Sequence, residues 1–207
     1  AANHHEAYAP ILQAVADAAL VSTSAAQVDA DSMLLLTALR SIASAVGPRA
    51  APSSGADFAA LEEAKKDAAA AQAAAMLSAR GAIGQGELRS FYAAWLASLF
   101  DALRLGQADP EGRAALAEIS YLAWHGAIKE QGLKFAIVPE RVAPVVESML
   151  SLVVRAISSS SVDAAAEFLA SYPARVPDNV AVALSAIEIA RVPRGVAVYY
   201  SLAASER

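Results

Sequence analysis

Residues 87–105 read ELRSFYAAWLASLFDALRL. Their large apolar side chains recur at steps of three and four residues: Leu88, Phe91, Tyr92, Trp95, Leu96, Leu99 and Leu103. This spacing places all of them on one broad side of an α-helix. We therefore predict a helix over 87–105 at the centre of the hydrophobic core.

The same helical period runs through most of the remaining chain. It predicts helices at about 10–21, 31–46, 57–80, 110–131, 139–158, 160–172 and 177–191. A strand competes at 133–138, and 195–202 is open between helix and strand because apolar residues alternate there. The sequence thus predicts one all-α domain over 1–207, a compact bundle of seven or eight helices with minor β structure at 133–138 and 195–202.

Two segments are predicted to lie outside the helices. Residues 47–55, GPRAAPSSG, have the glycines, prolines and serines of an internal loop. Residues 1–9 are predicted to form a disordered arm, whose His4, His5 and Glu6 are either native or left from a tag. Adjacent residues on a helix point about 100° apart, so this trio does not predict a metal site.

Composition excludes several classes of protein. The 207 residues carry a net charge of -5, and the pair Lys65 and Lys66 is the largest basic cluster, which argues against nucleic-acid binding. Without cysteine, the chain forms no disulfide or thiolate metal site. The longest uncharged run, 68–79, is 12 residues, against the roughly 20 that cross a membrane. We expect a soluble chain without a transmembrane segment. It starts at Ala1, so either a targeting peptide has been removed or the sequence begins internally, and the pattern does not indicate a compartment.

No sequence motif for catalysis or a cofactor is present. Serine never occurs as G-x-S-x-G or S-x-x-K, and the glycines of 81–86 have the wrong spacing for a phosphate-binding loop. We interpret Glu62, Glu63 and Asp67 as helix-dipole and solvent features. Three arginines near the ends of apolar helices are interpreted as snorkelling to solvent, the alternative being that each holds a helix carbonyl or a carboxylate: Arg40, Arg104 and Arg155.

The segment 119–132, ISYLAWHGAIKEQG, holds the one histidine away from the N-terminal end. On a helix, no carboxylate or second imidazole lies three or four residues from His125, so we interpret it as a core histidine at a helix crossing. The alternative is a pocket for a planar or apolar ligand between helices. Four side chains would line that pocket: Trp95, Tyr121, Trp124 and His125.

These patterns predict a non-catalytic interaction, scaffold or accessory subunit of a homo-oligomer or larger complex, with no cofactor and no metal. The apolar faces at 142–157 and 195–203 exceed what one small core needs, which favours a protein partner. The alternative is a helical ligand-binding or sensory domain with an apolar pocket near Trp95 and Trp124. An enzyme ranks third, because His125 would have to meet an acid from a distant helix.

Overall fold

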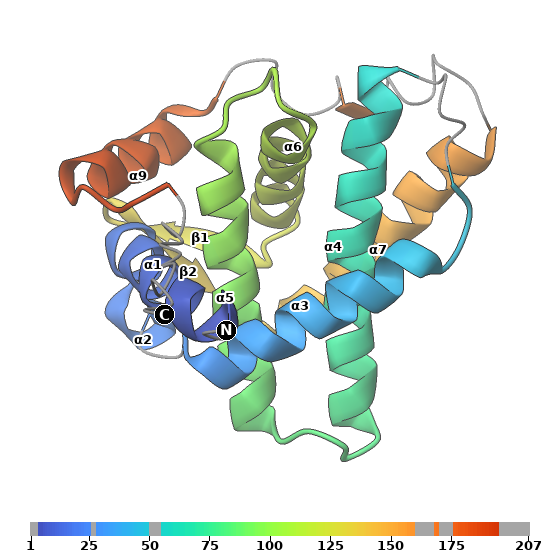
Figure 1. The fold of residues 1–207 in the computed structure, drawn as a ribbon, viewed down its shortest axis with the longest axis horizontal. Helices are drawn as coiled ribbons and strands as arrows, with labels where there is room; N and C mark the ends of the chain where they lie inside the picture. The colour runs from blue at the N-terminus through green and yellow to red at the C-terminus, as the bar shows by residue number, and fades with distance from the viewer. Residues whose placement is uncertain (1–3, 26–27, 50–54, 160–167, 170–175, 195–207) are drawn as a thin grey trace, which may run out of the picture.

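The computed structural model describes residues 4–25, 28–49, 55–159, 168–169 and 176–194. In this part of the chain, eight α-helices surround a core with one small β-hairpin, which confirms the predicted all-α fold (Figure 1). The helices are α1 (His4–Ala19), α2 (Ser22–Ala25), α3 (Ala30–Ala45), α4 (Ala56–Ala79), α5 (Gln85–Leu103), α6 (Pro110–Trp124), α7 (Pro139–Ser159) and α9 (Asp178–Ile189).

Helices α4 and α5 form the antiparallel centre of the bundle (Figure 1). Every residue of 91–100 in α5 is buried, which confirms the predicted central helix, although it starts at Gln85 rather than Glu87. Gly81 and Gly84 lie in the turn between the two helices, and Gly86 lies in the first turn of α5. Helix α5 is apolar on nearly all sides because α1, α3, α4 and α6 all pack against it.

Helix α4 is buried on several sides because α3, α5, α6 and α7 pack against it, and most of its buried residues are alanines. Its buried methyl groups include Ala60, Ala64, Ala68, Ala71 and Ala74. Helix α3 crosses it on one side and α7 packs along it on another (Figure 1). Small side chains at a helix contact permit short distances between helix axes. The alanine-rich stretch is therefore a packing element.

The helix predicted over 110–131 is too long. Gly126 has φ of 73°, and the N–H of Ala127 donates to the carbonyl of Leu122 at 2.8 Å, the arrangement of a helix ended by glycine. Strand β1 (Ile128–Gln131) follows and pairs antiparallel with β2 (Lys134–Ile137). The predicted minor β structure at 133–138 is confirmed as β2, and the end of the predicted helix forms β1, the strand that pairs with it.

At the N-terminal end, residues 4–9 of the predicted arm belong to α1, and residues 1–3 lie outside the described part. Pro10 lies inside α1 rather than at its start. The predicted loop 47–55 is non-helical where it is described, at 47–49 and 55. The predicted element at 195–202 lies outside the described residues, as does most of 160–172.

Helix α7 is the one described helix long and apolar enough, by length and composition, to cross a membrane. Its apolar face packs into the core through Val142, Val146, Met149 and Val153. The opposite face is exposed and carries charged residues such as Glu147 and Arg155. This two-sided pattern is typical of a core helix in a water-soluble protein. The apolar face at 142–157, which the sequence analysis counted as surplus, is used within the chain.

Candidate functional site

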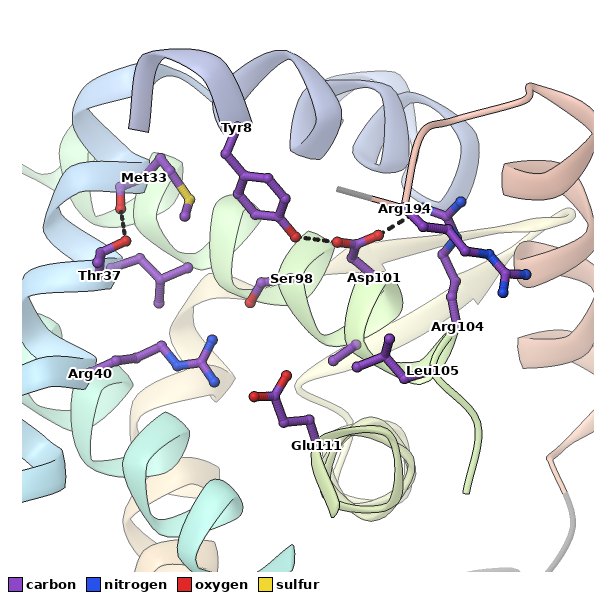
Figure 2. A pocket seen from close by; sticks show the side chains of 12 residues that line it. Tyr8, Met33, Thr37, Arg40, Ser98, Asp101, Arg104, Leu105, Glu111 and Arg194 are labelled. Carbon is purple, nitrogen blue, oxygen red and sulfur yellow. Dashed lines mark hydrogen bonds and ion pairs between the residues drawn. The ribbon is translucent and has the colours of Figure 1, made fainter. Parts of the chain in front are cut away.

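A groove with charged walls opens where α3, α5 and the first turn of α6 meet α1 (Figure 2). Its cavity measures about 240 Å³. The charged and polar side chains of its wall are Tyr8, Thr37, Arg40, Ser98, Asp101, Arg104, Glu111 and Arg194. We call this cavity the groove.

Arg40 connects the groove to a buried carboxylate. Its Nε lies 2.6 Å from Oδ1 of Asp67, and its Nη2 lies 3.9 Å from Oε2 of Glu63. The Arg40 side chain is 30% exposed, whereas that of Asp67 is 6% exposed. In Figure 2 the guanidinium points from α3 into the groove. One edge of this cation therefore faces the interior and the rest faces the groove.

A second buried acid, Glu118 of α6, lies behind this ion pair. Its side chain is fully buried, and neither carboxyl oxygen has a hydrogen-bond partner in the described part of the chain. Burial raises the pKa of Glu118 well above its usual range, the charge of Asp67 raises it further, and Arg40 opposes the rise. Burial also raises the pKa of Asp67, against the effect of Arg40. Glu118 therefore retains its proton well above the pH at which an exposed glutamate loses it.

The interpretation of Glu62, Glu63 and Asp67 as solvent features is wrong for Asp67, which is buried and paired. The sequence did carry a sign of this, because Asp67 stands three residues from Ala64 and four from Ala71 on the buried face of α4. The neighbouring Lys65 is buried too, and its Nζ lies 2.7 Å from Glu62 Oε2 and 2.7 Å from the carbonyl oxygen of Pro48. The charged residues of α4 thus bind it to α3, through Arg40, and to the loop after α3, through the carbonyl of Pro48.

The opposite wall of the groove contains a chain of hydrogen bonds. The Tyr8 hydroxyl donates to Oδ2 of Asp101, and Nη1 of Arg104 donates to Oδ1 of the same carboxylate at 2.7 Å. Burial raises the pKa of Tyr8, and the charge of Asp101 raises it further, so the phenol stays protonated. Both carboxylate oxygens of Asp101 therefore already accept hydrogen bonds from neighbouring side chains.

Arg104 also holds the C-terminal side of the described structure. It donates to the carbonyl oxygens of Val192 at 2.5 Å and Pro193 at 3.2 Å, and its Nε lies 3.2 Å from Glu188 Oε1. Hydrogen bonds from Arg104 and then from Arg194 lower the pKa of Glu188. Snorkelling was therefore the wrong interpretation for Arg40 and Arg104, and the alternative, that they hold a carboxylate, is correct.

Glu111 faces Arg40 across the groove (Figure 2). It stands in the first turn of α6, where Asp109 caps the helix by accepting from the N–H of Glu111 at 2.9 Å. Gly112 fixes this turn, because a Cβ there would lie 2.3 Å from the carbonyl oxygen of Gly106. A guanidinium opposite a carboxylate offers hydrogen-bond donors and acceptors on facing walls, which is what a peptide group, with its C=O and N–H, requires.

The residues predicted to line an apolar pocket are placed differently. Trp95 is buried inside α5, whereas Trp124 is 80% exposed at the end of α6. Tyr121 is buried and shares a 2.9 Å hydrogen bond with Ser148 Oγ, and its ring centroid lies 4.2 Å from that of His125. The prediction of a core histidine is wrong, because α6 ends at Trp124 and leaves His125 exposed.

None of these four side chains lines the groove. The sequence pattern indicated Arg40 and Arg104 as partners for carboxylates or carbonyls but not as a site, and no pattern pointed to Glu111 or Asp101. In the described ranges, no three His, Cys, Asp or Glu side chains are grouped so that they could hold a metal ion.

Comparison with known families finds no match, and no curated protein matches the chain. Two solved structures do resemble it. The first is the structure of DPP III from Caldithrix abyssi, with a TM-score of 0.84 and 18% identity over 94% of this chain. The second is dipeptidyl-peptidase III from Corallococcus sp. strain EGB, with a TM-score of 0.85 and 23% identity, also over 94% of this chain.

The chain spans about two fifths of the length of these solved chains, 39% and 38% respectively. The likeness concerns the fold, and the fold is that of part of a peptidase. It overturns the predicted non-catalytic interaction, scaffold or accessory subunit, together with the sensory-domain alternative. The structural relatives of this helical bundle are dipeptidyl-peptidase III structures, and the chain shares their fold over nearly its whole length.

Proposed function

We propose that this chain is part of a peptidase-type protein that acts on short peptides, and that the groove between α3, α5 and α6 contacts the peptide. The observation that carries the proposal is the likeness of 94% of the chain to two solved structures, those of DPP III from Caldithrix abyssi and dipeptidyl-peptidase III from Corallococcus. A fold is shared by proteins of different activity, so the charges of the groove are a second, independent support.

The groove supports peptide binding through Arg40 and Glu111, which face each other (Figure 2). The guanidinium donates hydrogen bonds and matches the carbonyl oxygens of a peptide, and the carboxylate accepts from its N–H groups.

Incubating the 207-residue protein with peptides of four to six residues tests the proposal. Mass spectrometry would follow the release of dipeptides, and isothermal titration calorimetry would measure binding. We expect dipeptide release or saturable binding, reduced about tenfold or more by Glu111→Gln, because the uncharged amide accepts hydrogen bonds from peptide N–H groups more weakly than the carboxylate does.

Glu147→Gln is the matched control, since Glu147 is exposed on α7, away from the groove. Absence of both cleavage and binding would refute the proposal. Cleavage that survives Glu111→Gln and Arg40→Gln unchanged would show that the groove is not the site.

A further inference from the structure

The groove continues along α3 beyond the cavity of Figure 2. A second hollow of about 330 Å³ shares Thr37, Arg40 and Glu111 with it. Its other walls are Ser41 and Ser44 of α3 and Lys66 of α4. Thr37, Arg40, Ser41 and Ser44 lie three and four residues apart, so they share one face of α3. A ligand that contacts Arg40 can therefore extend into either hollow.

Arg40, which lines both hollows, has hydrogen-bond donors that its neighbours leave unused. A guanidinium carries five N–H donors. Its Nε is engaged by Asp67 at 2.6 Å, and Nη2 approaches only Glu63, at 3.9 Å. Within the described residues, Nη1 donates no hydrogen bond. Because Asp67 fixes one edge of the planar group, the remaining donors are held in place for an acceptor from outside.

Lys66 adds a second cation to the same hollow. Its Nζ lies 2.5 Å from Oε2 of Glu63, and its side chain is 25% exposed. The serine and threonine hydroxyls of the α3 wall donate to helix carbonyls, as Ser41 does to Thr37 at 2.8 Å. Their oxygens remain as acceptors, so the strong donors of the hollow are Arg40 and Lys66, and their natural ligand is an anionic oxygen pair.

The last residue of a peptide offers such a pair. Its carboxylate matches a guanidinium in a bidentate geometry, and the N–H of the same residue, next to that carboxylate, requires an acceptor such as Glu111, which lines both hollows. A C-terminal amide has the same shape and lacks the charge. The groove is therefore arranged to distinguish a free carboxyl end from a blocked one.

We propose that Arg40 and Lys66 form a subsite for the C-terminal carboxylate of a short peptide, with Glu111 accepting from its last N–H. The inference rests on the proposed function, because it assigns a substrate class to the same groove. It limits the substrates to peptides short enough to place their free end beside α3.

Calorimetric titration of the native protein with tetra-alanine and with its C-terminal amide tests the subsite. We expect the amide to bind about tenfold more weakly or worse, since a charge-assisted hydrogen-bonded pair is lost. In Arg40→Gln the acid and the amide should bind equally. Lys66→Gln should reduce the difference in affinity between the acid and the amide. Lys129 is an exposed lysine of β1, and Lys129→Gln should leave that difference unchanged.

The comparison of acid with amide uses the native protein, so it holds even if Arg40→Gln folds poorly. Equal affinities of the native protein for both peptides would refute the subsite and leave the proposed function standing. Binding of neither peptide would refute the proposed function, and the subsite with it.

Discussion

Nε of Arg40 and Oδ1 of Asp67 are 2.6 Å apart, and they join the wall of an open groove to the interior of the bundle. Arg40 thereby has two functions: it compensates a buried carboxylate of α4, and it presents donors to whatever occupies the groove. Changes at this pair should alter both stability and binding.

Replacing Arg40 by methionine should lower the free energy of unfolding by about 3 kcal/mol, because it leaves Asp67 buried without its cation. Urea unfolding followed by circular dichroism measures the loss. Arg155→Met is the control, since Arg155 is exposed on α7, and it should change stability by less than about 0.5 kcal/mol. Equal stability of the two variants would contradict the structural role of Arg40.

The raised pKa values of Asp67 and Glu118 predict a pH dependence of stability. Burial raises the pKa of Asp67 from 3.8 to about 6 and raises the pKa of Glu118 well above 4.5, so both groups bind protons more tightly in the folded state. The stabilisation that these two groups provide is complete at pH values below their pKa in the unfolded chain. It declines as the pH rises from there through their pKa in the folded protein, by up to about 1.4 kcal/mol per pH unit for each group.

Glu118→Gln should remove the part of that decline that belongs to Glu118. We expect a flatter dependence of the unfolding free energy on pH, at pH values above the ordinary pKa of 4.5, than in the native protein. Glu147→Gln, at an exposed site, should keep the native slope. A slope unchanged by Glu118→Gln would show that the acid does not titrate anomalously.

Gly112→Ala should destabilise the protein by about 1–3 kcal/mol, because the new methyl group would lie 2.3 Å from the carbonyl oxygen of Gly106 and must displace backbone. Gly86→Ala is a matched control in the first turn of α5, where nothing lies within 4 Å of the added carbon. It should be neutral or stabilising by up to about 1 kcal/mol. Thermal unfolding of both variants measures these changes, and equal unfolding temperatures would contradict the close contact at Gly112.

Arg104→Lys should loosen α9 without unfolding the bundle. The lysine cannot make the separate contacts of Arg104 to Asp101, Glu188 and the carbonyl of Val192. Amide hydrogen exchange in 178–189 should accelerate about tenfold, while exchange in α5 stays slow. Arg194→Lys, at a largely exposed side chain, should leave α9 protected. Uniform acceleration throughout the chain would instead indicate global destabilisation.

The helical pattern of the sequence was sufficient for the fold. Steps of three and four apolar residues located α3, α4, α5, α7 and α9 within a few residues, since burial of one face dictates that period. The end of α6 was missed because Tyr121, Leu122 and Ala127 still fit a helix, and the positive φ of Gly126 is not visible in a periodic pattern. His125 was therefore assigned to the core, and Trp124 to a pocket between helices, although both lie on the surface.

The groove could not be predicted in the same way. Charged residues are rarely buried, so Asp67 and Glu118 were assigned to solvent or not considered. Arg40, Asp101 and Glu111 stand on three different helices, and only the tertiary fold brings them to one cavity. The functional prediction was wrong for a related reason: it relied on the absence of local motifs, whereas the likeness to peptidases lies in the arrangement of helices at 18–23% identity.

The predicted protein partner or homo-oligomer stays a prediction, and so does a small apolar ligand. The prediction of a protein partner relied on two apolar segments, 142–157 and 195–203. The first no longer supports it, because the apolar face of α7 is buried against the chain itself. The other, the segment 195–203, lies outside the described residues.

The methyl groups of α4 have a mechanical consequence. Alanine has no side-chain rotamers, so an interface built from it cannot absorb a disturbance by swinging a side chain from one staggered position to another. Displacing α4 would require whole helices to slide. Asp67 is thus held by a helix that cannot shift alone, and its position relative to Arg40 is set by the distances between the helix backbones.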